Sequence, residues 1–183
     1  YANGHGVTRD YVKAIKYYAM AADAGDAAAQ NNLGLCYRRG FGVKVDLQKA
    51  VQYFKLSAQQ KNVGGLNNLA FCYYHGYGVK QSMDMAIRYY EICAELGDPV
   101  SQYTLGTIYY FGNTPKNKKN FKKAFNYFQQ SALQGNADAQ LSLGFCYEYA
   151  YGVSKNFRKA NDMYKRSADQ GNLQALKILD RDQ

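Results

Sequence analysis

Few residues in this chain are of the types that most often carry catalysis or bind metal. The 183 residues include two histidines and four cysteines. No Cys-x-x-Cys or His-Glu-x-x-His motif occurs, and no nucleophile elbow or cofactor fingerprint is found. His5 and His75 lie in or beside predicted turns. We therefore expect no catalytic residues, no metal and no cofactor, and we predict that the protein is not an enzyme.

The segment 76–82, Gly-Tyr-Gly-Val-Lys-Gln-Ser, is superficially similar to a phosphate-binding loop. It lacks the Gly-Lys-Ser/Thr ending of that motif, and it follows a predicted helix and not a strand. Segments that begin at Gly4 and Gly40 have the same pair of glycines. We interpret all three segments as turns between helices.

These turns belong to a repeat that runs through the chain. Two landmarks recur in steps of 36 residues, with a single step of 38. A period of this length indicates stacked helical units, each of which buries its apolar face against its neighbours. It favours an extended binding surface over a catalytic cleft. The landmarks are a pair that begins at Lys13, Lys49, Met85, Lys123 and Lys159, and a leucine at 33, 69, 105, 143 and 179.

Each repeat contains the signals of two helices. In residues 26–60, Ala29, Leu33 and Tyr37 form one stripe of a helix that Gly40 can end. A glycine at position 34 is tolerable in that helix if another helix approaches it closely. The second helix of the repeat has an amphipathic face that includes Phe54.

Ten positions suited to cap a helix N-terminus keep the repeat spacing. Each holds Asp, Asn or Ser, whose side chain can accept a hydrogen bond from an N–H of the first turn. They predict an all-α chain of about nine helices, with a single second helix, then four pairs, then a terminal first helix. The second-helix caps are Asp10, Asp46, Ser82, Asn120 and Asn156, and the first-helix caps are Asp26, Asn62, Asp98, Asn136 and Asn172.

Three of the four cysteines occupy one repeat position, three residues after the core leucine. Cys36, Cys72 and Cys146 are therefore predicted to be small buried side chains. Equivalent helices pack about 8–10 Å apart, whereas a disulfide needs Cα atoms within roughly 7 Å. We expect these thiols to stay unbridged, which favours a cytoplasmic location.

The repeated residues resemble the Sel-one-like repeat, a subfamily of the tetratricopeptide repeats. This resemblance implies a right-handed α/α superhelix, or solenoid, that acts as an interaction scaffold or adaptor for peptide segments or domains of other proteins. Cysteine-rich relatives suggest the alternative of a hydrolase-type enzyme. They also pair a cysteine at the position of Cys93 with one eight residues later, where this chain has Ser101. The matching residues are Leu33-Gly34, Tyr37, the turn 40–43, Asp46, Lys49-Ala50, Tyr53-Phe54 and Ser57-Ala58.

We predict one solenoid over residues 1–183. Tyr1 aligns with Tyr37 one period later, so the chain is expected to begin partway through a repeat of a longer protein. No apolar run approaches the ~20 residues of a membrane span. The expected units are a partial repeat 1–25, repeats 26–61, 62–97, 98–135 and 136–171, and a terminal helix 172–183.

A second stripe on the first helices is the predicted binding surface. In the solenoids of this superfamily the first helices line the concave face, so the resemblance implies that this stripe contacts a partner. Its aromatic rings would supply contact area and its polar groups would hold a peptide backbone. The alternative is that Phe71 and Phe145 only complete the core. The stripe comprises Asn31, Leu35, Arg38, Asn67, Phe71, Tyr74, Tyr103, Thr107, Tyr110, Leu141, Phe145 and Glu148.

A basic segment is the second candidate site. The chain has a net charge of +9, and five lysines gather where one turn is two residues longer than the others. The segment is either a solvated loop or a docking site for an acidic partner. Nucleic acid has weaker support as a partner, because no recognised motif or stacking platform accompanies the charge. The lysines are Lys116, Lys118, Lys119, Lys122 and Lys123.

Overall fold

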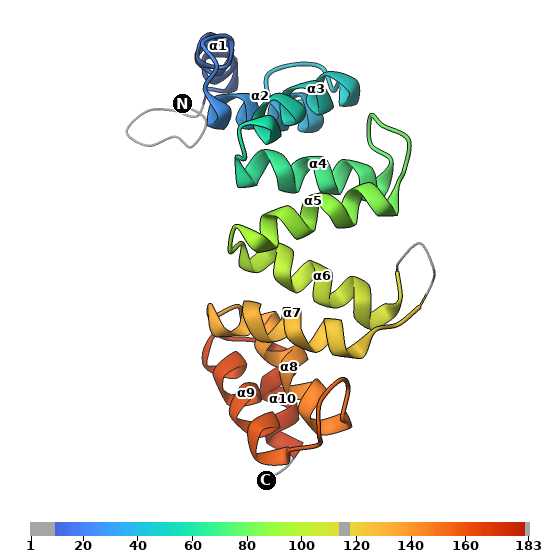
Figure 1. Cartoon of the computed structure of the whole chain (residues 1–183). Coiled ribbons are helices and arrows are strands. Elements are labelled where there is room, and N and C mark those ends of the chain that lie inside the picture. Colours follow the sequence, from blue (N-terminus) through green and yellow to red (C-terminus); the bar gives the residue numbers. More distant parts are fainter. Residues whose placement is uncertain (1–9, 114–117, 182–183) are drawn as a thin grey trace. The chain divides into compact units, whose positions relative to one another are not determined.

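The computed structural model describes residues 10–113 and 118–181, which contain ten α-helices and no strand (Figure 1). The all-α prediction is confirmed, and the predicted count of about nine is one too low, because the predicted order itself contains ten helices. The expected order of a single second helix, four pairs and a terminal first helix is observed. The helices are α1 (Tyr11–Asp23), α2 (Ala27–Arg39), α3 (Leu47–Gln59), α4 (Val63–His75), α5 (Met83–Glu95), α6 (Pro99–Phe111), α7 (Phe121–Leu133), α8 (Ala137–Tyr149), α9 (Phe157–Asp169) and α10 (Leu173–Arg181).

The predicted caps begin these helices. The carboxylate of Asp26 accepts a hydrogen bond of 2.6 Å from the Ala29 N–H, and Ser82 and Asn172 make the equivalent bond at α5 and α10. The other seven predicted positions also accept from the N–H three residues further on. A cap of this kind stabilises a helix by about 1 kcal/mol relative to alanine. All ten cap predictions are confirmed.

The first helices end in a residue with left-handed backbone. Gly40, Gly76 and Gly112 have φ between 73° and 79° after α2, α4 and α6. After α8 the same conformation is adopted by Ala150, with a φ of 58°. Its Cβ makes this backbone less favourable than it is for glycine.

The helices of a pair approach closely where the first helix carries glycine. A Cβ on Gly34 would lie 2.6 Å from the Phe54 ring, closer than real Cβ contacts occur. The expectation of a close helix approach at this glycine is therefore confirmed. The same contact recurs at Gly106 with Phe128 and at Gly144 with Tyr164, at 2.5 and 2.4 Å.

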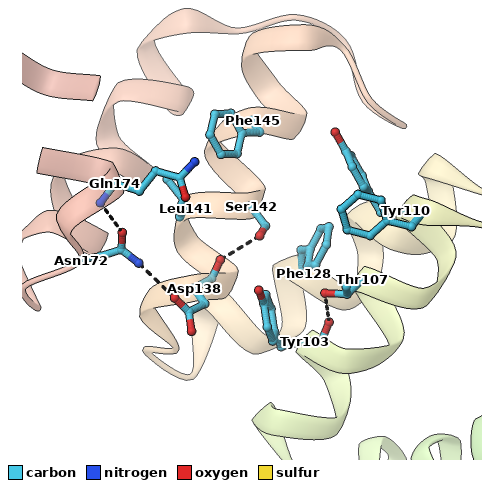
Figure 2. A pocket seen from close by; sticks show the side chains of 11 residues that line it. Tyr103, Thr107, Tyr110, Phe128, Asp138, Leu141, Ser142, Phe145, Asn172 and Gln174 are labelled. Atoms are coloured by element: carbon cyan, nitrogen blue, oxygen red, sulfur yellow. Dashed lines mark hydrogen bonds between the residues drawn. The ribbon is translucent and has the colours of Figure 1, made fainter. Parts of the chain in front are cut away.

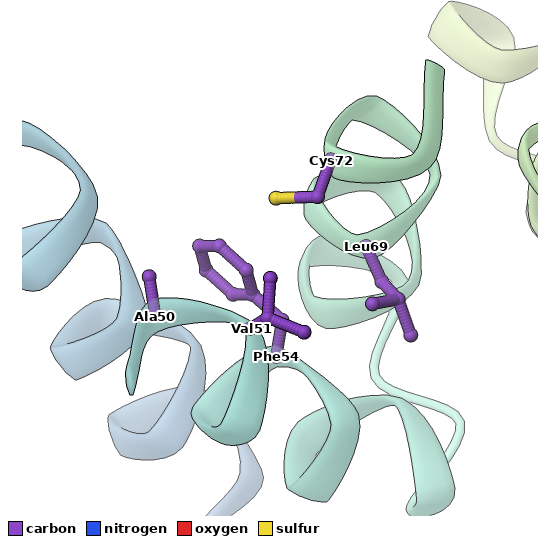
Figure 3. Packing of buried hydrophobic residues seen from close by; sticks show 5 residues of the cluster. All are labelled: Ala50, Val51, Phe54, Leu69 and Cys72. Carbon is purple, nitrogen blue, oxygen red and sulfur yellow. The ribbon is translucent and has the colours of Figure 1, made fainter. Parts of the chain in front are cut away.

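The chain divides into two compact units, residues 1–92 and residues 93–183, and each is described by itself. In unit 1, helices α2, α3 and α4 bury a core cluster of Ala50, Val51, Phe54, Leu69 and Cys72 (Figure 3). Within unit 2, α6 packs on α7, α7 on α8, α8 on α9, and α9 on α10. None of the described helices is long and apolar enough to cross a membrane.

The same polar contacts join neighbouring helices in both units. In unit 1 the Ser57 hydroxyl donates to the Ala27 carbonyl at 2.7 Å, and the Gln60 amide donates to the Gln30 side chain at 2.9 Å. Unit 2 repeats both bonds twice. The serine bonds are Ser131 to Pro99 and Ser167 to Ala137, and the glutamine bonds are Gln134 to Gln102 and Gln170 to Gln140.

All four cysteine side chains are buried thiols, as predicted for Cys36, Cys72 and Cys146. Burial raises the pKa of Cys72 to about 11 and that of Cys146 to about 12. Burial also raises the pKa of Cys93 to about 11, although a hydrogen bond with the Ser101 side chain opposes this shift. At neutral pH these thiols are protonated and poorly nucleophilic.

Candidate functional site

The predicted stripe in unit 2 lines a cavity of about 360 Å³ (Figure 2). Tyr103, Thr107 and Tyr110 reach it from α6, and Leu141 and Phe145 reach it from α8. On each helix these residues are three or four positions apart, so they lie on one face. The structure therefore brings five of the six stripe residues of this unit to one place.

Six further residues complete the lining and were missed at the sequence level. Asp138 lies three positions before Leu141, and Ser142 lies three positions before Phe145, so both share that face of α8. Helical spacing alone could have revealed them. Phe128 comes from α7 and is buried, so it forms the floor. The remaining residues are Phe111 at the end of α6, and Asn172 and Gln174 at the start of α10.

Hydrogen bonds fix the polar side of this cavity. The Asn172 amide donates to the Asp138 carboxylate at 3.0 Å, while its oxygen accepts from the backbone of Gln174. The Ser142 hydroxyl donates to the Asp138 carbonyl at 2.8 Å, and the Thr107 hydroxyl donates to the Tyr103 carbonyl at 3.1 Å. The cavity is thus preorganised and does not depend on a ligand to order these side chains.

Aromatic contacts fix the other side. The Tyr110 ring lies 6.3 Å from Phe128 and 5.5 Å from both Phe121 and Tyr151, measured between ring centroids. Burial raises the pKa of the Tyr110 hydroxyl. Tyr103 lies 5.9 Å from Phe128. These rings form a continuous, supported surface that can bind apolar or cationic groups.

The repeats that build this cavity also match a known family. The model of the Sel1 repeat matches residues 1–26, 27–62, 64–98, 99–136 and 137–172. The chain belongs to the Sel1 repeat family. Proteins with this repeat generally act as scaffolds for interactions with other proteins. No match was found among curated proteins.

Solved structures agree with this family and with its all-helical fold. A Sel1 repeat protein from Oxalobacter formigenes is 35% identical with a TM-score of 0.90, over 97% of this chain and 72% of that one. A protective antigen of uropathogenic Escherichia coli, with an SLR fold, is 34% identical with a TM-score of 0.89. The match covers 95% of this chain but only 37% of that antigen. Cysteine rich protein B of Helicobacter pylori is 26% identical with a TM-score of 0.56, over 74% of this chain and 96% of that one.

Glu148, the sixth stripe residue of unit 2, does not line the cavity. Its carboxylate accepts a hydrogen bond from the Tyr164 hydroxyl of α9. Burial and this bond raise the pKa of Tyr164. Glu148 therefore joins α8 to α9.

In unit 1 the stripe is differently arranged. The Asn68 amide donates to the Asn31 side chain at 2.8 Å, so these polar groups join α2 to α4. Leu35 packs against the core cluster of this unit. Asn67 is half-buried. These positions therefore take part in contacts within unit 1, whereas their copies in unit 2 line the cavity.

The end of the unit 1 stripe carries positive charge over aromatic rings. The Arg38 guanidinium lies 5.0 Å from the Phe71 ring centroid, and burial lowers its pKa, as does the charge of Arg39. Both arginines line an open hollow with Phe71, Leu47 and Tyr77. The ring centroid of Tyr74 lies 4.9 Å from that of His75.

The described lysines of the basic segment are exposed, and Lys116 lies outside the described residues. The Lys123 ammonium lies 4.7 Å from the Tyr109 ring centroid and 3.4 Å from its hydroxyl. The same repeat contact joins Lys49 to Tyr37 and Lys159 to Tyr147, at 4.5 and 5.4 Å. Lys123 is thus part of a contact that recurs between repeats. Lys119 also has a counterpart, because its ammonium lies 6.0 Å from the Phe121 ring centroid and that of Lys155 lies 4.5 Å from the Phe157 ring centroid one repeat later.

Neither the geometry nor the residue types in the described ranges assemble a metal site. No group of three His, Cys, Asp or Glu side chains is close enough there to hold a metal ion. The surface instead offers preorganised hollows with aromatic walls, which suit binding.

Proposed function

We propose that the chain is a non-enzymatic scaffold that binds an extended segment of a partner protein, with the unit 2 cavity as the principal contact. The observation that supports this most is the cavity itself. Its volume of about 360 Å³ suits one or two side chains of a partner. Aromatic residues held in such pockets often dominate binding energy.

A selection of displayed random peptides against the whole chain tests the proposal, with binding then measured on variants. Ser142→Phe fills the cavity without removing a core contact, and Phe145→Ala removes one of its walls. We expect each to weaken the selected peptides at least tenfold, about 1.4 kcal/mol.

The control is Gln52→Phe, which adds the same ring at an exposed position of α3 in unit 1. Thermal unfolding of each variant shows whether the fold persists. If Ser142→Phe remains folded and binds every selected peptide as the native chain does, the cavity is not the binding site.

The hydrolase alternative has less support. A cysteine nucleophile works as an exposed thiolate beside a base, whereas burial raises the pKa of Cys72, Cys93 and Cys146. The same buried thiols suit a reducing compartment, and we propose the cytoplasm. Docking of an acidic partner at Lys118, Lys119 and Lys122 also remains a proposal. Repeating the peptide selection on a Lys119→Glu/Lys122→Glu variant tests whether acidic peptides depend on these lysines.

A further inference from the structure

The charge of the unit 2 cavity is opposite to that of the chain. The chain carries a net charge of +9, yet the cavity has one charged side chain among the described residues that line it, the Asp138 carboxylate. Asp138 belongs to α8, so the α8 side of the cavity carries a negative charge.

Three polar side chains on this side already use a donor. The Ser142 and Thr107 hydroxyls donate to carbonyls of their own helices, and the Asn172 amide donates to Asp138 (Figure 2). These groups present lone pairs to a ligand, and the Asp138 carboxylate can accept several further hydrogen bonds. A group rich in N–H donors fits this side better than a carboxylate or carbonyl does.

The opposite side is aromatic. Figure 2 shows the rings of Tyr110 and Phe128 across the cavity from Asp138 and Asn172. A cation over the face of such a ring is attracted by its quadrupole, and burial strengthens the effect. Aromatic faces also pack well on the aliphatic stem of lysine and on the plane of arginine.

We propose that this cavity binds a positively charged side chain, lysine or arginine, of the partner segment, with its N–H groups on Asp138 and its stem against Tyr110 and Phe128. This inference rests on the proposed function, because it names the residue that enters the same cavity. It also separates this site from the basic segment, whose lysines would attract the opposite charge.

The exposed Lys119, Lys122 and Lys177 of the same unit do not line the cavity. They repel a cationic partner at long range, and salt screens this repulsion beyond about 10 Å at 0.1 M. A contact with Asp138 is made at hydrogen-bond distance, well within this screening length. The preference for a cation therefore arises from contacts in the bound complex, and not from long-range attraction as the partner approaches.

The experiment uses the whole chain and the displayed random peptides. Peptides whose binding is lost in Ser142→Phe are sequenced, and one selected basic residue is replaced by a neutral analogue of the same shape, citrulline for arginine or norleucine for lysine. We expect these replacements to weaken binding about 3- to 30-fold to the native chain. On Asp138→Asn this preference should fall several-fold, because only the aromatic contact with the cation remains.

Asp84→Asn is the matched control. Asp84 is exposed and, like Asp138, is the second residue of its helix, so both substitutions remove the same charge from a first turn. The control should keep the full preference for the basic peptide, and thermal unfolding should shift similarly in the two variants.

The outcomes separate the two proposals. If peptides depend on the cavity but show no preference for lysine or arginine, or keep that preference in Asp138→Asn, the cation inference is wrong and the proposed function stands. If no selected peptide is weakened by Ser142→Phe, both are overturned. Enrichment of acidic peptides that depend on the cavity also overturns the cation inference.

Discussion

Units 1 and 2 are built from the same kind of helix pair, yet they use one surface differently. In unit 1 the side chains of Asn31 and Asn68 hydrogen-bond across α2 and α4. The equivalent positions in unit 2 hold Tyr103 and Ser142, which line the cavity. Thus the same backbone leaves neighbouring first helices bound to one another in one unit and separated by a hollow in the other.

A third position reinforces this difference. Gly64 in unit 1 corresponds to Asp138 in unit 2. A Cβ on Gly64 would lie 3.0 Å from the Asn31 amide, so the glycine leaves room for the Asn31–Asn68 bond. The charges along the stripe differ as well, since Arg38 and Glu148 occupy the same repeat position. The comparison teaches that a few stripe residues set binding, while the repeat residues set the fold.

The largest expected effect comes from disrupting the close helix approach that both units share. Gly34→Val in unit 1 and Gly106→Val in unit 2 add a side chain at positions where even a Cβ would lie 2.5–2.6 Å from a phenylalanine ring. We expect each substitution to lower the free energy of unfolding by about 3 kcal/mol. Urea unfolding followed by circular dichroism measures the loss.

The control for these variants is Lys55→Val, at an exposed position of α3, which should cost about 0.5 kcal/mol through helix propensity alone. A loss below 1 kcal/mol in either glycine variant would show that the helices of that unit do not approach as closely as described.

The second effect transfers the closed surface of unit 1 to unit 2. The triple variant Asp138→Gly/Tyr103→Asn/Ser142→Asn gives unit 2 the residues that unit 1 has at the α2–α4 contact, two asparagines and a glycine. We expect peptides selected on the native chain to bind it at least tenfold more weakly, because the hollow and its carboxylate are lost. Fluorescence anisotropy with a labelled selected peptide measures this.

The reciprocal variant Asn31→Tyr/Asn68→Ser/Gly64→Asp removes the bond of unit 1 and leaves unit 2 unchanged. It should keep peptide binding within about twofold. Retained affinity in the unit 2 variant, with the fold intact by circular dichroism, would contradict the assignment of the difference to these three positions.

The smallest effect concerns the turn after each first helix. Ala150 in unit 2 has the left-handed backbone that Gly76 has in unit 1. Ala150→Gly should stabilise the chain by about 0.5 kcal/mol, since relief of strain exceeds the added entropy of the unfolded chain. Gly76→Ala should destabilise it by about 1 kcal/mol. Opposite thermal shifts are expected, about twice as large for Gly76→Ala as for Ala150→Gly. A destabilised Ala150→Gly would show that its turn carries no strain.

The sequence predicts the fold well because its signals are local. Asp26 lies three residues before the N–H that it caps, and Gly34 lies within the helix that it opens to Phe54. Such signals repeat from copy to copy, so a helix predicted in one copy is supported by the same prediction in the others. The family follows from the same residues.

The candidate site is predicted less completely. Tyr103, Tyr110 and Phe145 follow from helical spacing, but Phe128 and Asn172 enter the cavity from other helices. Their approach depends on packing between repeats, which no spacing within one helix encodes. Glu148 has the right spacing, yet its bond to Tyr164 directs it elsewhere. The concave placement of the stripe and the basic docking site stay predictions.

The serine and glutamine contacts within each helix pair have a consequence for how such a chain can grow. Ser57 and Gln60 bind groups of the preceding helix, and Ser131 and Gln134 do the same two repeats later. Donor and acceptor of each bond lie in the same repeat, so a duplicated copy brings both of them with it. Gene duplication can therefore lengthen the protein by whole units without new complementary mutations, and each added unit supplies fresh stripe positions on which selection can act.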